Sequence, residues 1–348
     1  MDKNNQLETA PIGKLVFKLA IPTVMAQLVN LLYNIVDRIY VGRIPEIGSL
    51  SLAGLGVTFP IILLVSAFAM LAGMGGASRA AVSMGEKDND KAEKILGNCT
   101  MLLIIFSVVL AVVFMLTKNQ ILMKFGASEA TLPYASDYIS IYLVGTIFVQ
   151  IALGLNLFIT NQGFAKTSMM TVCIGAVLNI VLDPIFIYVF GMGVKGAALA
   201  TIISQGVSCL WVLKFLTGKK TVLKIRLKNL ALDGKIVTSV LSLGVSPFIM
   251  QATECLIQLT FNNGMLKYGN DLYVALMSIL FSLTQLIWMP LNGFSQGAQP
   301  VIGYNYGAKR FDRVKKAFKL QFTVSICFSL CGCACRSVPD GVFEDVHK

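Results

Sequence analysis

The chain is a series of long apolar runs separated by short polar or basic segments. Each run is about 20 residues or longer, the length that an α-helix needs to cross a hydrocarbon core of ~30 Å. Runs of this length favour a helical bundle over a barrel of short alternating strands. The pattern predicts nine helices, over Leu15–Tyr40, Leu52–Ala77, Ala92–Thr117, Tyr134–Ile159, Ser168–Phe190, Ala197–Leu216, Ile236–Asn262, Leu272–Gly297 and Ala317–Cys335.

The composition agrees with a protein that lies in a membrane. Of the 348 residues, 55% are hydrophobic and only 14% are charged, and the mean hydropathy is +0.73. Soluble domains carry about 25% charged residues. We therefore expect an all-α polytopic membrane protein whose main surroundings are the lipid bilayer. The net charge of +11 does not form the basic face of a soluble domain, so we expect no nucleic acid partner, and we predict no obligate protein partner.

The placement of Lys and Arg predicts the orientation. If the nine helices alternate in direction, 21 basic residues fall on the side of the N-terminus and 5 fall on the other side. Cytoplasmic loops carry the excess of Lys and Arg, so the N-terminus is predicted to be cytoplasmic. No cleavage site follows the polar first 14 residues, which favours a retained first helix over a removed signal peptide. We expect a multi-pass protein of the cell (inner or plasma) membrane.

An internal repeat divides the chain. The segment after the second predicted helix returns after the eighth at an offset of 222 residues, because Gly75, Gly85, Asp90, Lys91 and Lys94 match Gly297, Gly307, Asp312, Arg313 and Lys316. Six helices separate the copies, which predicts a parallel repeat about an axis along the membrane normal. We expect a six-helix lobe over residues 1–216, a basic cytoplasmic linker over 217–235, an incomplete second lobe over 236–335 and an atypical polar tail over 336–348. A full second copy would need roughly 100 more residues, so we interpret the second lobe as truncated; a nine-helix variant is the alternative.

The fifth predicted helix carries the strongest site candidate. Asn179 and Asp183 are four residues apart and so share one helix face, and Pro184 removes a backbone donor and is expected to bend the helix there. An ionisable residue inside an apolar run is costly and is usually turned toward a cavity. The alternative is that Asp183 lies near a helix end and reaches the headgroups.

Two further carboxylates lie within predicted helices. Asp37 lies late in the first helix, and its alternative role is an interfacial pair with Arg38. Glu254 lies in the seventh helix, and its alternative role is a buried acid that is satisfied by Gln251 or Gln258. No phosphate-binding loop and no catalytic Ser/His/Asp or Cys/His set is present, so we expect neither an enzyme nor a cofactor other than a coupling ion.

Three motifs carry a resemblance to a known family. N-I-V-D-R-I-Y-V-G in the first helix, N-x-x-x-D-P in the fifth and G-x-x-x-G-A-x-x-x-D after the eighth resemble the multidrug and toxic compound extrusion (MATE) family, most of all its MepA-like bacterial branch. The resemblance extends from Leu15 to Leu330. It implies two six-helix lobes around a V-shaped cavity, and export of cationic, amphiphilic drugs in exchange for H⁺ or Na⁺. The family's cation-site groups fall on Asp37, Asn179 and Asp183, with the hydroxyl of Thr201 as an added ligand and Glu254 as a second-lobe acid.

The resemblance leads to a functional prediction with two alternatives. We expect a cation-coupled multidrug antiporter in which Asp37, Asn179, Asp183 and Thr201 hold a proton, a Na⁺ or a cationic drug. The first alternative is a flippase for lipids or lipid-linked sugars of the same superfamily, but its cavity would more often be cationic, and these apolar runs carry acids. The second is an inactive, truncated membrane remnant.

Overall fold

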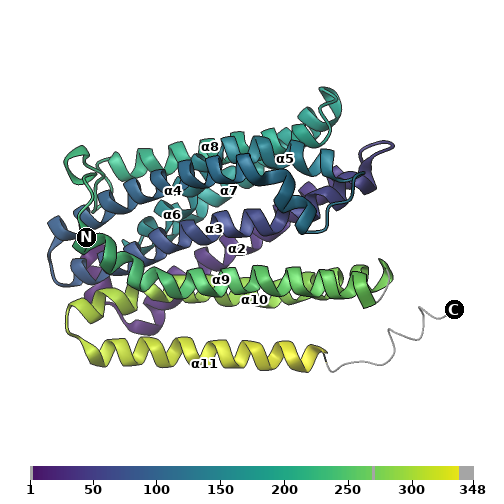
Figure 1. Ribbon diagram of the computed structural model, residues 1–348. Coiled ribbons are helices and arrows are strands. Elements are labelled where there is room, and N and C mark those ends of the chain that lie inside the picture. The colour runs from purple at the N-terminus through teal and green to yellow at the C-terminus, as the bar shows by residue number, and fades with distance from the viewer. Residues whose placement is uncertain (1–2, 269–270, 337–348) are drawn as a thin grey trace.

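The computed structural model describes residues 3–268 and 271–336, which form a bundle of long helices (Figure 1). The helices are α1 (Lys3–Thr9), α2 (Ile12–Gly42), α3 (Gly48–Gly85), α4 (Asn89–Lys124), α5 (Leu132–Val144), α6 (Thr146–Asn161), α7 (Ala165–Pro184), α8 (Val194–Thr217), α9 (Gly234–Tyr268), α10 (Asp271–Gly307) and α11 (Phe311–Arg336), with a π-helical turn at Ile185–Val189 and a 3-10 turn at Leu227–Asn229. All predicted spans are helical. The end of the polar tail, residues 337–348, lies outside the described residues.

Six of the described helices are long and apolar enough to cross a membrane, and the bent pair α5–α6 raises the number to seven. The prediction of one continuous helix over Tyr134–Ile159 was wrong, because α5 and α6 meet at Gly145 at an angle of 60°. A Cβ on Gly145 would overlap the side chain of Ile202, so the break places α8 directly against the bare backbone. The predicted run Tyr134–Ile159 contains no proline that would have marked the break.

The hydrogen-bonding pattern changes immediately after Pro184. α7 ends at this residue and the backbone continues as the π-turn Ile185–Val189, within one apolar span that reaches Val189. A proline lacks the backbone donor that would continue the α-helical ladder, and single π-turns are common at functional sites. The structure therefore has a wider turn after Pro184, whereas the bend that the sequence predicted there stays a prediction.

The two halves meet in reciprocal contacts. A Cβ on Gly85 of α3 would overlap the carbonyl oxygen of Tyr304 in α10, and a Cβ on Gly307 of α10 would overlap that of Val82 in α3. Both residues of one contact are displaced by 222 positions from their counterparts in the other. Each residue of one contact is thus replaced by its counterpart from the other half in the second contact. This reciprocity is the signature of two halves related by a two-fold axis. They confirm the parallel repeat that the sequence predicted, although the exact lobe boundaries stay a prediction.

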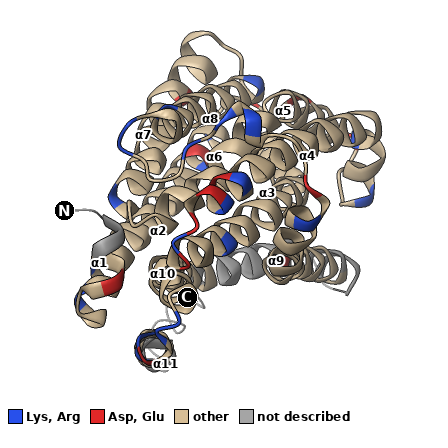
Figure 2. Ribbon diagram, turned by 90° about the vertical axis from the view of Figure 1, so that its left-hand side faces the viewer, with Lys and Arg blue, Asp and Glu red and all other residues tan. Residues whose placement is uncertain are grey.

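One end of the bundle holds the N-terminus, the α3–α4 turn, the segment between α8 and α9, and the α10–α11 turn (Figure 1). We call it the basic end, because many of the Lys and Arg residues lie there (Figure 2). Polar contacts join the halves toward this end: Thr23 donates to the Gly293 carbonyl at 2.5 Å, and Arg79 donates to Ser239 at 2.5 Å. Toward the opposite end, α2 and α3 diverge from α9 and α10 (Figure 1).

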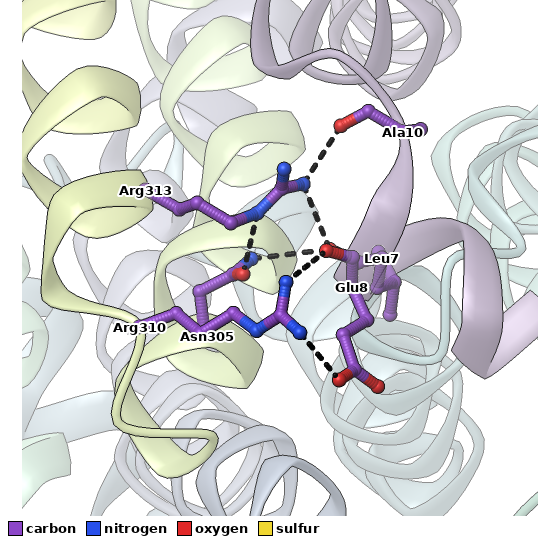
Figure 3. A network of polar contacts seen from close by, with 6 residues as sticks. All are labelled: Leu7, Glu8, Ala10, Asn305, Arg310 and Arg313. Atoms are coloured by element: carbon purple, nitrogen blue, oxygen red, sulfur yellow. Dashed lines mark hydrogen bonds and ion pairs between the residues drawn. The ribbon is translucent and has the colours of Figure 1, made fainter.

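The short helix α1 was not predicted, because seven polar-rich residues are too few to be helical alone. Tertiary contacts hold it in place (Figure 3). Arg313 donates to the carbonyl oxygens of Ala10 at 2.7 Å and Leu7 at 3.4 Å, and to Asn305 Oδ1 at 2.8 Å. Arg310 pairs with Glu8 at 3.1 Å. The side chain of Leu7 is buried, so α1 is fastened to the second half by polar contacts and to the core by one apolar side chain.

The segment between α8 and α9 is also held against the first half. Gln162 Oε1 accepts hydrogen bonds from Thr221 Oγ1 and from the backbone of Val222 and Leu223, at 2.8–2.9 Å. Glu93 forms an ion pair with Arg226 at 2.6 Å. The predicted linker is therefore a docked segment rather than a free tether.

Candidate functional site

The buried polar face of α7 provides the first part of the site. Asn179 and Asp183 are both buried, at 2% and 0% exposed, and Asn179 Nδ2 donates to Asp183 Oδ1 at 3.2 Å. The one-face geometry expected from their four-residue spacing is present. Because Asp183 is fully buried, it does not extend to the surface of the bundle where headgroups would meet it.

α8 supplies a hydroxyl from the facing side. Asn179 Nδ2 also approaches Thr201 Oγ1 at 3.4 Å, and Thr201 itself donates to the carbonyl oxygen of Ala197 at 3.0 Å. A threonine that donates to the preceding turn keeps its lone pairs free to accept. The oxygen of Thr201 is therefore directed toward the amide of Asn179 and is available as a neutral ligand.

α2 brings the second acid. Asp37 lies next to Asp183, close enough for each carboxyl group to feel the charge of the other. Asp37 forms no ion pair with Arg38 in the described part of the chain; instead the Arg38 guanidinium lies 5.5 Å from the centre of the Phe59 ring. The interfacial pair that we considered for Asp37 is therefore absent from this structure.

Three buried oxygens of this cluster have no donor. They are Asp37 Oδ1, Asp183 Oδ2 and Asn179 Oδ1. Two acids in contact in a medium of low dielectric cannot both carry an unshielded negative charge, so a shared proton or a bound cation is needed between them. Carboxylate, amide and hydroxyl oxygens are the donors that hard cations prefer. The residues present therefore fit a proton or a Na⁺, with Asp37, Asn179, Asp183 and Thr201 as the groups that would hold it.

Two tyrosines border the cluster and were missed by the sequence analysis. Tyr33 of α2 lies beside both acids, and Tyr138 of α5 is within hydrogen-bonding reach of Thr201. Tyr33 precedes Asp37 by four residues and so shares its helix face, which is a signal that the sequence contains. Tyr138 lies on another helix, and no local pattern relates it to Thr201.

Glu254 is not part of this cluster. Its side chain is exposed on α9, and it forms no hydrogen bond or ion pair within residues 3–268 and 271–336. The adjacent Cys255 is buried and points its sulfur to the carbonyl oxygen of Pro60, at 3.6 Å. Glu254 therefore lies apart from the four residues that the structure brings together. The partners Gln251 and Gln258 that we considered for it are not hydrogen-bonded to it.

Comparisons with known proteins agree with this architecture. The MatE family model matches residues 22–185 and 247–338. The chain is 27% identical over 333 residues to the multidrug export protein MepA of Staphylococcus haemolyticus, and 26% identical over 338 residues to MepA of Staphylococcus aureus; each alignment covers 94% of this chain and 73% of the relative.

Solved structures show the same fold. A crystal structure of MATE in the straight conformation superposes with a TM-score of 0.86 at 27% identity, covering 94% of this chain and 73% of the other. An outward-facing multidrug resistance MATE transporter of the MOP superfamily superposes with a TM-score of 0.87 at 26% identity, covering 94% and 72%. The chain belongs to the MatE family of membrane transporters and is not an enzyme.

Proposed function

We propose that this chain is a multidrug efflux antiporter of the cell membrane that exports cationic, amphiphilic compounds in exchange for H⁺ or Na⁺. The observation that carries the proposal is the set of buried acceptors without donors, Asp37 Oδ1, Asp183 Oδ2 and Asn179 Oδ1. Each unsatisfied buried polar group costs about 1–3 kcal/mol. A positive ligand at this point would offset that cost.

Exchange would follow from competition for the two acids. A proton, a Na⁺ or the cationic group of a drug would each neutralise the negative charge of Asp37 and Asp183, and they could not do so at the same time. A ligand shifts a conformational equilibrium only by its difference in affinity between the two states. A coupling cation and a drug that favour different states of the bundle would therefore drive each other in opposite directions.

The arrangement of the two halves supports a state open away from the basic end. The halves touch closely through Gly85 and Gly307, and they diverge at the opposite end (Figure 1). The excess of basic residues supports a cytoplasmic position for the basic end. In this orientation the cytoplasmic side is closed, as expected of an exporter that has just presented its cargo to the outside.

The experiment is drug transport by the chain in proteoliposomes. Ethidium movement is followed by fluorescence under an imposed Na⁺ gradient, an imposed pH gradient, or neither. We expect transport that depends on one gradient and is lost in Asp183→Asn. Transport of a fluorescent lipid but not of ethidium would favour the flippase, and no movement of either would favour the inactive remnant.

A further inference from the structure

A buried polar stripe continues from the acids toward the basic end, inside the first half. On α7 it consists of Ser168, Thr171, Gly175, Asn179 and Asp183, spaced three or four residues apart and so on one face. The four residues other than glycine are at most 5% exposed. At a rise of about 1.5 Å per residue, the stripe extends roughly 22 Å along the helix. That distance reaches from the site to the beginning of α7 at the basic end.

α8 lines the stripe with hydroxyl groups. Thr201, Ser204 and Ser208 follow the same three- or four-residue spacing, and Ser204 and Ser208 are buried. Ser208 Oγ donates to the carbonyl oxygen of Thr171 at 3.1 Å. A Cβ built on Gly175 would lie 2.6 Å from Ser208 Oγ, so the glycine makes room for this hydroxyl between the helices.

α6 and the residue after it extend the stripe toward the basic end. Thr160 Oγ1 donates to Ser168 Oγ at 2.8 Å, and Asn161 and Gln162 follow directly in the chain. Gln162 is fully buried and accepts from Thr221 in the segment between α8 and α9, at 2.8 Å. Polar groups therefore connect the acids with the docked segment at the basic end.

Several buried polar atoms of the stripe have no hydrogen-bond partner among the described residues. Ser204 Oγ and both polar atoms of the Asn161 side chain are buried and have no partner, and Asn156 Oδ1, beside Thr160, also lacks a donor. Buried polar groups are nearly always satisfied, by ordered water where the protein offers no partner. Hydrogen bonds between helices explain the partnered hydroxyls, but they do not explain the unpartnered ones.

We propose that this stripe is a hydrated path that connects the acid pair with the basic end within the first half, and that the coupling cation moves along it. The coupling part rests on the proposed function, whereas the hydrated path does not. The path consists of hydroxyl and amide groups whose oxygens can accept a cation. Between Asp183 and the basic end its residues carry no ionisable group that would hold a cation tightly. A cation released from between Asp37 and Asp183 would then leave through the first half rather than between the two halves.

The path is tested by the access of a small cation to single cysteines. Ag⁺ reacts with thiols and needs hydrated passage. The eight native cysteines are replaced, and Ser204→Cys and Thr171→Cys are introduced one at a time on two helices. Ala198→Cys is the matched control, because Ala198 is fully buried on α8 in an apolar cluster. Ag⁺ is applied to the basic end in vesicles of known orientation, and thiols that remain are counted with maleimide after unfolding.

We expect Ag⁺ from the basic end to block Ser204→Cys and Thr171→Cys at least about tenfold faster than Ala198→Cys, because the proposed path passes the first two positions and not the third. Gly175→Leu, which fills the space beside Ser208, should slow the reaction at Ser204→Cys by a similar factor. Equal rates at all three positions, or reaction only from the opposite end, would overturn the path. Size-exclusion profiles identify any variant that fails to fold, and the two cysteine positions serve as replacements for each other.

The Ag⁺ test of the path and the efflux test of the proposed function can fail separately. Ag⁺ access with efflux that does not need Asp183 would leave the path in place and remove the proposed coupling. Efflux that needs Asp183, without Ag⁺ access, would leave the function in place and remove the path.

Discussion

The two halves of the molecule repeat their packing but not their chemistry. Gly85 and Gly307 are counterparts in the repeat, and each lies directly against the backbone of the other half. Lys91 and Arg313 are also counterparts in the repeat, yet Lys91 pairs with Glu86 on the surface at 3.3 Å, whereas Arg313 fastens α1. The acids of the two halves also have different surroundings, although they are not counterparts: Asp183 of α7 is fully buried beside Asp37, whereas Glu254 of α9 is exposed and has no hydrogen-bond or ion-pair partner in the described residues.

This difference teaches that matched backbone contacts do not require matched side-chain contacts. The contact between the halves needs only small residues at matched positions, and duplication supplies these on both sides. A cation site needs several oxygens from different helices, and in the first half α2, α7 and α8 bring these together. In the second half, the described helices α9, α10 and α11 are the counterparts of α2, α3 and α4. The predictions below test whether the halves divide their roles in this way.

The largest effect is expected at the buried acid. Asp183→Asn keeps the shape of the side chain but removes the charge that a cation would neutralise. We expect ethidium efflux to fall at least about tenfold, equivalent to ~1.4 kcal/mol, at unchanged membrane expression. Asp137→Asn is the matched control, because Asp137 is an exposed acid that pairs with Lys195 at 3.4 Å. Equal efflux in the two variants would exclude Asp183 from the site.

The reciprocal glycines are expected to have the next largest effect. Gly85→Leu and Gly307→Leu each add a side chain where the opposite backbone lies, so each should force the halves apart at the basic end. We expect spin labels at Lys94 and Lys316 to show a severalfold larger population of long distances in both variants. Gly56→Leu on α3 is the control, because nothing lies within 4 Å of a Cβ there. A change in only one of the two variants would contradict the two-fold relation.

A smaller effect is expected at Arg313 and its counterpart Lys91, whose removal should affect the stability of α1 differently. Arg313→Gln removes charged donors to Leu7 and Ala10, each worth about 1.5–3 kcal/mol, so amide hydrogen exchange over α1 should accelerate about tenfold or more. Lys91→Gln removes an exposed ion pair worth about 0–1 kcal/mol, and exchange should change little. If both variants left exchange over α1 unchanged, Arg313 would not be what holds this helix.

The smallest effect is expected at the exposed acid. Glu254→Gln should alter ethidium efflux by no more than about twofold, since Glu254 has no hydrogen-bond or ion-pair partner in the described residues and lies apart from the acid pair. The same efflux assay measures it beside Asp183→Asn. A loss as large as that of Asp183→Asn would place a second essential acid in the second half.

The spanning helices and the relation of the two halves could be predicted, because long apolar runs and an internal repeat determine them. The runs predicted every spanning helix and the 222-residue offset predicted the relation of the halves. The break at Gly145 could not be predicted, since the side chain that packs against it, Ile202, is more than 50 positions away along the chain. α1 could not be predicted either, because Arg313 and Leu7 stabilise it through tertiary contacts.

The site could be predicted only in part. The spacing of Asn179 and Asp183 established their common face, whereas Thr201 and Asp37 joined them through resemblance to a family, and the structure then brought these groups together. Asn179 and Pro184 marked Asp183 as the stronger candidate in the sequence, but nothing there showed that Asp183 is buried and Glu254 exposed, because both are single acids in apolar runs. Their burial differs because of which neighbours their helices face, and a single sequence does not contain that information.

The most direct measurement is the release of cations when a drug binds. The purified chain is titrated with ethidium in weakly buffered solution, with and without Na⁺, while released protons and Na⁺ are counted. We predict that one cation is displaced for each drug bound, and that Asp183→Asn releases none. Ethidium that binds with unchanged affinity and releases the same cations in Asp183→Asn would contradict a cation site between Asp37 and Asp183.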